Sequence, residues 1–148
     1  MDDQDGEPQR ILVADDDAGI LRQVKRALEA DGFSVLTAGD GKEAYKLLQS
    51  EKPFAAAILD IVMPHIEGRD LVRYMQSERR LMKVPVIIMT TELNARLSSD
   101  SFSAGAAAFL PKPFTDSQLR TMLHMFVQPN QVSERFIFSG ERTGGDET

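Results

Sequence analysis

Five positions in the sequence carry acidic, hydroxyl or ammonium groups directly after short apolar runs, and they are Asp15, Asp16, Asp60, Thr90 and Lys112. Carboxylates packed close together repel one another and lose hydration, so they require a cation or stay partly protonated. Oxygen ligands without His or Cys suit Mg²⁺, which takes one or two carboxylates, waters and a phosphate oxygen. A carboxylate can also act as a nucleophile and form an aspartyl phosphate. A lysine and a hydroxyl can hold the equatorial oxygens of the transferring group. The set therefore indicates Mg²⁺-dependent phosphoryl chemistry.

Whether these groups meet depends on the elements that carry them. Five short apolar runs alternate with amphipathic segments, and the runs are Arg10–Ala14, Phe33–Ala38, Phe54–Leu59, Val86–Met89 and Ala107–Leu110. Several are apolar almost throughout, which is typical of parallel strands covered on both faces. Alternation repeated five times predicts a doubly wound α/β domain with right-handed crossovers. Ligands of such sheets lie at the carboxyl ends of the strands, so the five positions would gather at one edge.

The amphipathic segments predict five helices between and after these strands. The first has apolar residues at helical spacing from Ile20 to Leu28, with Asp17 as its N-cap and Gly32 as its C-terminal cap. The second, around 44–48, ends at Pro53, and the third, around 71–75, ends before Pro85.

The last two predicted helices differ in how strongly the sequence pattern supports them. The fourth, Asn94 to Ala104, is rich in serine and weakly patterned, so we expect it to be the least stable. The fifth opens with a capping-box pattern at Thr115 and Gln118. Its predicted buried residues are Leu119, Met122, Leu123 and Phe126.

Length and composition are those of one globular domain. The 148 residues are 42% apolar and 27% charged. Cysteine is absent, which excludes disulfides, thiolate metal sites and cysteine nucleophiles and agrees with a reducing, cytoplasmic location. The net charge of −6 argues against nucleic acid as a partner. No apolar run approaches the roughly 20 residues of a membrane helix, so we expect no membrane association.

The two ends of the sequence differ from its middle. Residues 1–9 read as a flexible acidic leader and residues 128–148, which are polar and glycine-rich, as a disordered tail with at most one extra helical turn. The predicted domain spans residues 10–127.

From Arg10 to Phe126 the chain resembles the receiver domain of bacterial response regulators. The resemblance rests on Ile11–Asp16 (ILVADD), on Leu59–Pro64 (LDIVMP) followed by Gly68, on Thr90, and on Lys112–Phe114 (KPF). Asp16 and Asp60 are 44 residues apart, Thr90 follows 30 residues later and Lys112 another 22. Each motif alone is common, but the ordered set at this spacing is specific.

The resemblance implies a flavodoxin-like receiver fold with the parallel strands in the order 2-1-3-4-5. It also implies that Asp60 accepts the phosphoryl group. Asp16 would bind Mg²⁺ directly, Asp15 mostly through water, and the main-chain carbonyl of Val62 would complete the protein ligands.

Further roles follow from the same resemblance. Thr90 and Lys112 would contact the phosphoryl oxygens, Phe109 would occupy the aromatic switch position, and the Lys112–Pro113 bond would be cis. The implied function is a phosphorelay switch that receives a phosphoryl group from a histidine kinase or histidine phosphotransfer protein. A downstream protein would then bind the face formed by the fourth helix, fifth strand and fifth helix.

Three positions depart from the family pattern. Phe109 stands where tyrosine is frequent, Thr91 is bulkier than the usual alanine, and Val62 is apolar where many relatives are polar. These departures bear on kinetics and on output coupling and remove no essential group.

Two alternatives use similar residues. A phosphatase of the haloacid dehalogenase class also uses Mg²⁺ and a nucleophilic Asp after a strand, but it needs a general acid two residues later, where Val62 stands. A pseudo-receiver that binds partners without phosphorylation would have lost Asp60, Lys112 or the acidic pair, and all are present.

Overall fold

A computed structural model describes residues 7–50, 52–91 and 95–128 of the chain. Its centre is a parallel five-stranded sheet whose strands are β1 (Arg10–Ala14), β2 (Ser34–Ala38), β3 (Ala56–Asp60), β4 (Val86–Thr90) and β5 (Ala108–Pro111). They lie in the order β2-β1-β3-β4-β5. The predicted doubly wound fold and its strand order are confirmed.

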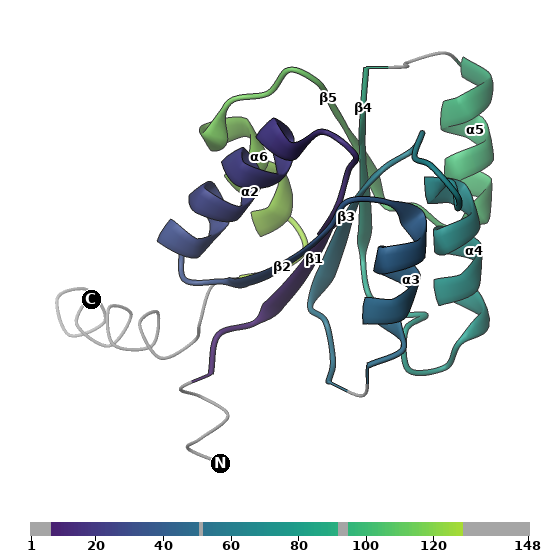
Figure 1. The fold of residues 1–148 in the computed structure, drawn as a ribbon, viewed down its shortest axis with the longest axis horizontal. Helices are drawn as coiled ribbons and strands as arrows, with labels where there is room; N and C mark the ends of the chain where they lie inside the picture. The colour runs from purple at the N-terminus through teal and green to yellow at the C-terminus, as the bar shows by residue number, and fades with distance from the viewer. Residues whose placement is uncertain (1–6, 51, 92–94, 129–148) are drawn as a thin grey trace, which may run out of the picture.

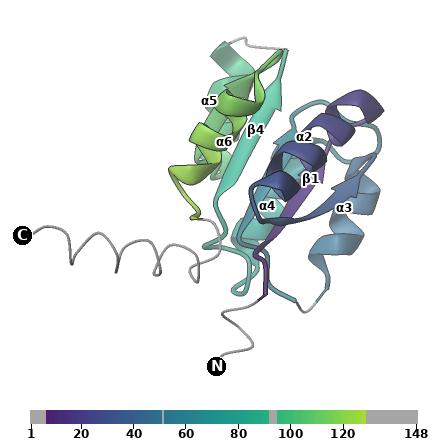
Figure 2. The ribbon, with the colours of Figure 1, turned by 90° about the vertical axis from the view of Figure 1, so that its left-hand side faces the viewer.

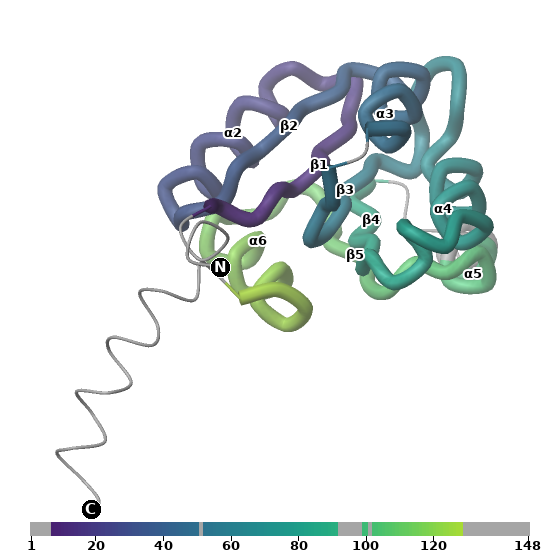
Figure 3. The backbone as a smooth tube through the Cα atoms, turned by 90° about the horizontal axis from the view of Figure 1, so that it is seen from below, coloured from purple at the N-terminus to yellow at the C-terminus, as the bar shows by residue number. Residues whose placement is uncertain are grey.

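Helices cover both faces of the sheet (Figure 1). They are α2 (Ala18–Ala30), α3 (Gly41–Leu48), α4 (Gly68–Ser77), α5 (Ala95–Ala104) and α6 (Asp116–His124). Figures 1 and 3 show α3, α4 and α5 against one face, and Figure 2 shows α2 and α6 together on the other. Because both faces are covered, β3 and β4 are buried along their whole length.

Side-chain caps fix where the helices next to the site begin. Asp17 accepts hydrogen bonds from the main-chain N–H groups of Gly19 (2.8 Å) and Ile20 (3.3 Å), so α2 starts directly after the acidic turn. Thr115 and Gln118 form the predicted capping box of α6. Gly32 has a φ of 93°, a left-handed conformation that suits glycine beyond the end of α2.

Several details differ from the sequence prediction. Asp60 and Thr90 are the last residues of β3 and β4 and do not follow them, because the parallel ladder continues to the pairs Asp60–Met89 and Thr90–Pro111. The predicted burial of Phe126 is wrong, since α6 ends at His124 and the Phe126 side chain is 37% exposed. Met122 is only partly buried against the core.

Most of the predicted leader (1–9) and of the predicted tail (128–148), together with the start of the fourth helix at Asn94, lies outside the described residues. Within the described ranges, no helix has the length and apolar character needed to cross a membrane.

Candidate functional site

The carboxyl end of β1 turns into α2 through three consecutive aspartates. The main-chain N–H of Asp15 donates to the carbonyl of Ala38 (3.1 Å), which continues the pairing with β2. The Asp15 side chain is fully buried, and its Oδ1 accepts the N–H of Asp17 (2.8 Å). Asp16 is exposed, and Asp17 caps the helix. The turn therefore presents one buried and one exposed carboxylate at the edge of the sheet.

Asp60 ends the neighbouring strand β3, with its side chain almost entirely buried. Its Oδ1 accepts the N–H of Val62 (3.2 Å), so the loop that follows the strand curls over the carboxylate. Helix α4 begins at Gly68, where an added Cβ would lie 2.4 Å from the Asp60 carbonyl oxygen. The absence of a side chain at Gly68 lets this loop close on the end of β3.

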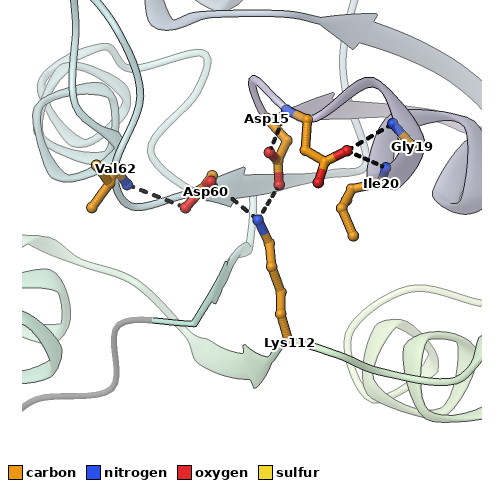
Figure 4. A network of polar contacts seen from close by, with 7 residues as sticks. Asp15, Gly19, Ile20, Asp60, Val62 and Lys112 are labelled. Atoms are coloured by element: carbon orange, nitrogen blue, oxygen red, sulfur yellow. Dashed lines mark hydrogen bonds and ion pairs between the residues drawn. The ribbon is translucent and has the colours of Figure 1, made fainter.

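Lys112 follows β5 and joins the two acidic strands. Its main-chain N–H donates to the Thr90 carbonyl (3.1 Å), and its side chain is only 12% exposed. The ammonium lies 2.5 Å from Asp15 Oδ2 and 3.1 Å from Asp60 Oδ2. Figure 4 shows the Lys112 side chain extended toward both carboxylates, with Val62 on the far side of Asp60.

Burial and charge act against each other at this site. Burial raises the pKa of Asp15 above its ordinary value, and the negative charge of Asp60 adds to the rise. The contact with Lys112 and the hydrogen bond from the N–H of Asp17 lower the pKa, but by less than burial raises it. Burial lowers the pKa of Lys112, but the ion pair with Asp15 and the charge of Asp60 outweigh it, so the pKa of Lys112 is raised overall. One ammonium therefore does not fully compensate the buried Asp15 carboxylate.

The three carboxylates that the sequence singles out come together. One carboxylate oxygen from each of Asp15, Asp16 and Asp60 lies within 4.8 Å of the others. Such an all-oxygen set, partly buried and incompletely neutralised, is chemically suited to a hard divalent cation such as Mg²⁺.

The other residues named from the sequence lie at or near the same end of the sheet, except Phe109, which lies two positions before the end of β5. Thr90, at the end of β4, is buried, whereas Thr91 is exposed. The side chain of Val62 is 52% exposed. Phe109 on β5 is partly buried, and its ring centroid lies 4.9 Å from that of Phe102 on α5. The Lys112–Pro113 peptide bond is cis.

One polar contact beside the site is absent from the sequence prediction. Gln23 on α2 donates from Nε2 to the main-chain carbonyl of Phe114 (3.1 Å) and to Asp116 Oδ1 (3.2 Å). Its partners lie 91 and 93 positions away in the sequence, and no local pattern marks such a contact.

Comparison with known proteins agrees with this arrangement. The family model of the response regulator receiver domain matches residues 11–124. Response regulator MprA of Mycolicibacterium vanbaalenii is 36% identical over 112 residues, which are 76% of this chain and 47% of that protein. The homologous protein of Mycobacterium sp. strain KMS is 32% identical over 127 residues, or 86% of this chain and 54% of that one. The chain thus spans about half the length of these curated relatives.

Solved structures with about 30% sequence identity to this chain show the same fold. Chemotaxis response regulator CheY4 of Vibrio cholerae has a TM-score of 0.76 and 28% identity, covering 81% of this chain and 99% of its own. A CheY-like receiver domain protein from Methanospirillum hungatei has a TM-score of 0.75 and 30% identity, covering 80% and 93%. The chain belongs to the response regulator receiver domain family of two-component signalling proteins.

Proposed function

We propose that this domain is a phosphorylation-dependent switch that accepts a phosphoryl group on Asp60 and then changes its binding to a partner. The observation that carries the proposal is the convergence of Asp15, Asp16, Asp60 and Lys112 at one edge of the sheet. Residues 10–127 would form the switch domain, and the family's donors, a histidine kinase or a histidine phosphotransfer protein, would supply the phosphoryl group.

The transfer step is a displacement at phosphorus. A carboxylate oxygen of Asp60 forms the new O–P bond while the N–P bond of the donor phosphohistidine breaks, and the imidazole nitrogen keeps the electron pair. The product is an acyl phosphate on Asp60. Lys112, which already lies beside Asp60 Oδ2, would shift to an oxygen of the phosphoryl group, and Thr90 would contact a second one.

The carboxylate cluster would hold Mg²⁺ for this step. Asp16 and Asp60 would be direct ligands, Asp15 would act mostly through water, and the Val62 carbonyl would complete the protein ligands. When bound, the ion neutralises charge on the transferring phosphoryl oxygens. Asp15 supports this assignment because it is a buried carboxylate whose pKa is raised despite its contact with Lys112.

The response to phosphorylation would pass through β4 and β5. Thr90 would move toward the phosphoryl group, and Phe109 would fill the space it leaves, a shift between two packings. Because the Phe109 ring packs against Phe102, this movement would alter α5 as well. The changed surface of α5, β5 and α6 would bind the downstream protein, and we place the whole process in the cytoplasm.

The two alternatives fit the geometry less well. A phosphatase would require a general acid two residues after Asp60, and that position holds a half-exposed valine. A pseudo-receiver has no use for a lysine held between two buried carboxylates, since such an arrangement is costly to maintain.

The switch is tested by hydrogen exchange with beryllofluoride and Mg²⁺, which mimic the phosphoryl group. We expect the largest changes in residues 95–104 and 108–111, and no change in an Asp60→Asn variant that cannot form the adduct. A response confined to α2 and α3, or an equal response in the variant, would contradict the proposal.

A further inference from the structure

We propose that Gln23 is a positioning residue that holds Lys112 at Asp60 by anchoring the turn after β5 to α2. The inference rests on the proposed function, because it assigns Gln23 a part in phosphoryl transfer. It concerns a side chain that does not touch the reacting groups and acts through Lys112.

The contact joins two segments that bring opposite charges to the site. Helix α2 starts directly after the acidic turn at Asp15 and Asp16, while the turn after β5 carries Lys112. Gln23, about one and a half helical turns into α2, donates to the carbonyl of Phe114, two residues beyond Lys112. A single amide group therefore ties the acidic side of the site to its basic side.

The anchored turn has little freedom left. The N–H of Lys112 is bonded to the Thr90 carbonyl, and the Phe114 side chain is buried in the core beneath α2 and α6. The hydrogen bond from Gln23 adds a third restraint, because it holds the main-chain carbonyl of Phe114, the residue directly after Pro113. Together the restraints set the point from which the Lys112 side chain starts toward Asp60.

Both partners of Gln23 are acceptors, which fixes the orientation of its amide. Asp116, in the first turn of α6, takes the second bond of Nε2 at 3.2 Å. Only a donor at position 23 satisfies a carbonyl and a carboxylate at once. A side chain of the same size without a donor would leave the Phe114 carbonyl without this restraint.

Packing alone does not explain the contact. Helices α2 and α6 are in contact, and Val24, Leu28, Leu119 and Leu123 belong to the same buried apolar cluster. Apolar contacts hold the two helices together but do not fix the path of the main chain between Lys112 and Thr115. The hydrogen bond fixes that path, so its loss should affect the reaction more than the fold.

The test measures two properties that depend on different sides of the site. One is the rate of phosphorylation by acetyl phosphate with saturating Mg²⁺, followed by intact mass, and it depends on Lys112. The other is the affinity for Mg²⁺, measured by calorimetry, and it depends on carboxylates from β1 and β3. The variants are Gln23→Met, which keeps the size and loses the donor, and Gln23→Lys, which restores a donor. Arg22→Met, at the exposed neighbouring position, is the control.

We expect Gln23→Met to slow phosphorylation about threefold to tenfold, the effect of one directed hydrogen bond, without weakening Mg²⁺ binding. Gln23→Lys should recover most of the rate, and Arg22→Met should match wild type. In a Lys112→Met background, Gln23→Met should have no further effect, because its role acts through that lysine.

Each other outcome overturns the inference. If wild type is phosphorylated and Gln23→Met reacts at the same rate, Gln23 does not position Lys112, and the proposed function still stands. Equal losses of rate and of Mg²⁺ affinity would mean that Gln23 only supports the fold. If wild type itself takes no phosphoryl group, the proposed function fails and the inference fails with it.

Discussion

The ammonium of Lys112 lies 3.1 Å from Asp60 Oδ2, although 52 positions separate the two residues in the sequence. The same ammonium is paired with the buried carboxylate of Asp15. One positive charge therefore stands between two buried negative charges, with the exposed Asp16 beside them. The excess negative charge suits the site to the divalent cation that we propose it binds, and that cation would offset the negative charge of an arriving phosphoryl group.

Replacing Lys112 with methionine should destabilise the metal-free protein on the order of 3 kcal/mol, because two buried carboxylates lose their counter-charge. Urea unfolding in EDTA measures this loss, and added Mg²⁺ should restore part of it. Lys25→Met is the control, since its pair with Glu29 is about half exposed and should contribute less than about 0.5 kcal/mol. Similar losses for the two variants would mean that the charges at the site are not coupled as described.

Magnesium should raise the melting temperature of wild type by mass action, by an amount that corresponds to about 2.7 kcal/mol at a concentration 100 times the dissociation constant. Asp16→Asn should remove most of this response because it neutralises one of the two carboxylates that we propose as direct ligands. Asp17→Asn keeps the N-cap of α2 and removes a neighbouring charge, so it should keep the response. A response lost in Asp17→Asn and kept in Asp16→Asn would place the ion elsewhere.

The raised pKa of Asp15 predicts a pH dependence of the metal-free protein. A carboxyl whose pKa is higher in the folded state stabilises the fold below its unfolded pKa, and this contribution is lost as pH rises through the folded pKa. The stability of Asp15→Asn relative to wild type should therefore increase with pH across that window and then level off. Lys112 has a raised pKa and stays protonated throughout, so its own titration adds no pH dependence, and its contact with Asp15 is already included in the pKa of that carboxyl.

Denaturant unfolding in EDTA at several pH values provides the measurement. A difference between Asp15→Asn and wild type that stays flat or falls with rising pH would show that the charged form of Asp15 is not disfavoured by its burial.

Hydrolysis of the acyl phosphate should be faster in Val62→Asn than in wild type. The reaction needs a water in line with the O–P bond, and a polar side chain two residues past Asp60 can orient that water, whereas valine excludes it. The Val62 side chain is half exposed, so asparagine fits there without disturbing the core. Glu92, the polar residue two positions past Thr90 in the sequence, lies outside the described residues.

The decay of each phosphorylated protein after donor removal, at fixed Mg²⁺, is the readout. Val62→Thr, which has a similar shape and carries a hydroxyl, is a matched comparison. Decay in Val62→Asn that is no faster than in wild type would show that water exclusion by Val62 does not set the lifetime.

Much of the site is predictable because a parallel sheet gathers the carboxyl ends of its strands. Asp15 and Asp60 follow or end buried strands, and Lys112 follows an apolar run, so their meeting at one edge follows from topology. The cap of α2 by Asp17 and the capping box of α6 are local patterns, and both predictions are confirmed.

What the sequence does not predict depends on contacts between distant segments. The extension of β3 to Asp60 is set by pairing with Met89, and no residue near Asp60 signals it. Phe126 has apolar character at helical spacing, but α6 ends before it, so its ring is not carried into the core. Lys112 pairs with Asp15 as well as with Asp60, and Gln23 donates to Phe114. Both contacts join segments that meet only once the chain has folded, so no local pattern predicts them.

The identity of the phosphoryl acceptor is tested most directly by intact-mass measurement after incubation with acetyl phosphate. Wild type with Mg²⁺ should gain one phosphoryl group. Wild type in EDTA, and Asp60→Asn with Mg²⁺, should gain none, while Asp70→Asn, an exposed aspartate in the first turn of α4, should behave as wild type. Equal labelling of wild type and Asp60→Asn would contradict the account at its centre.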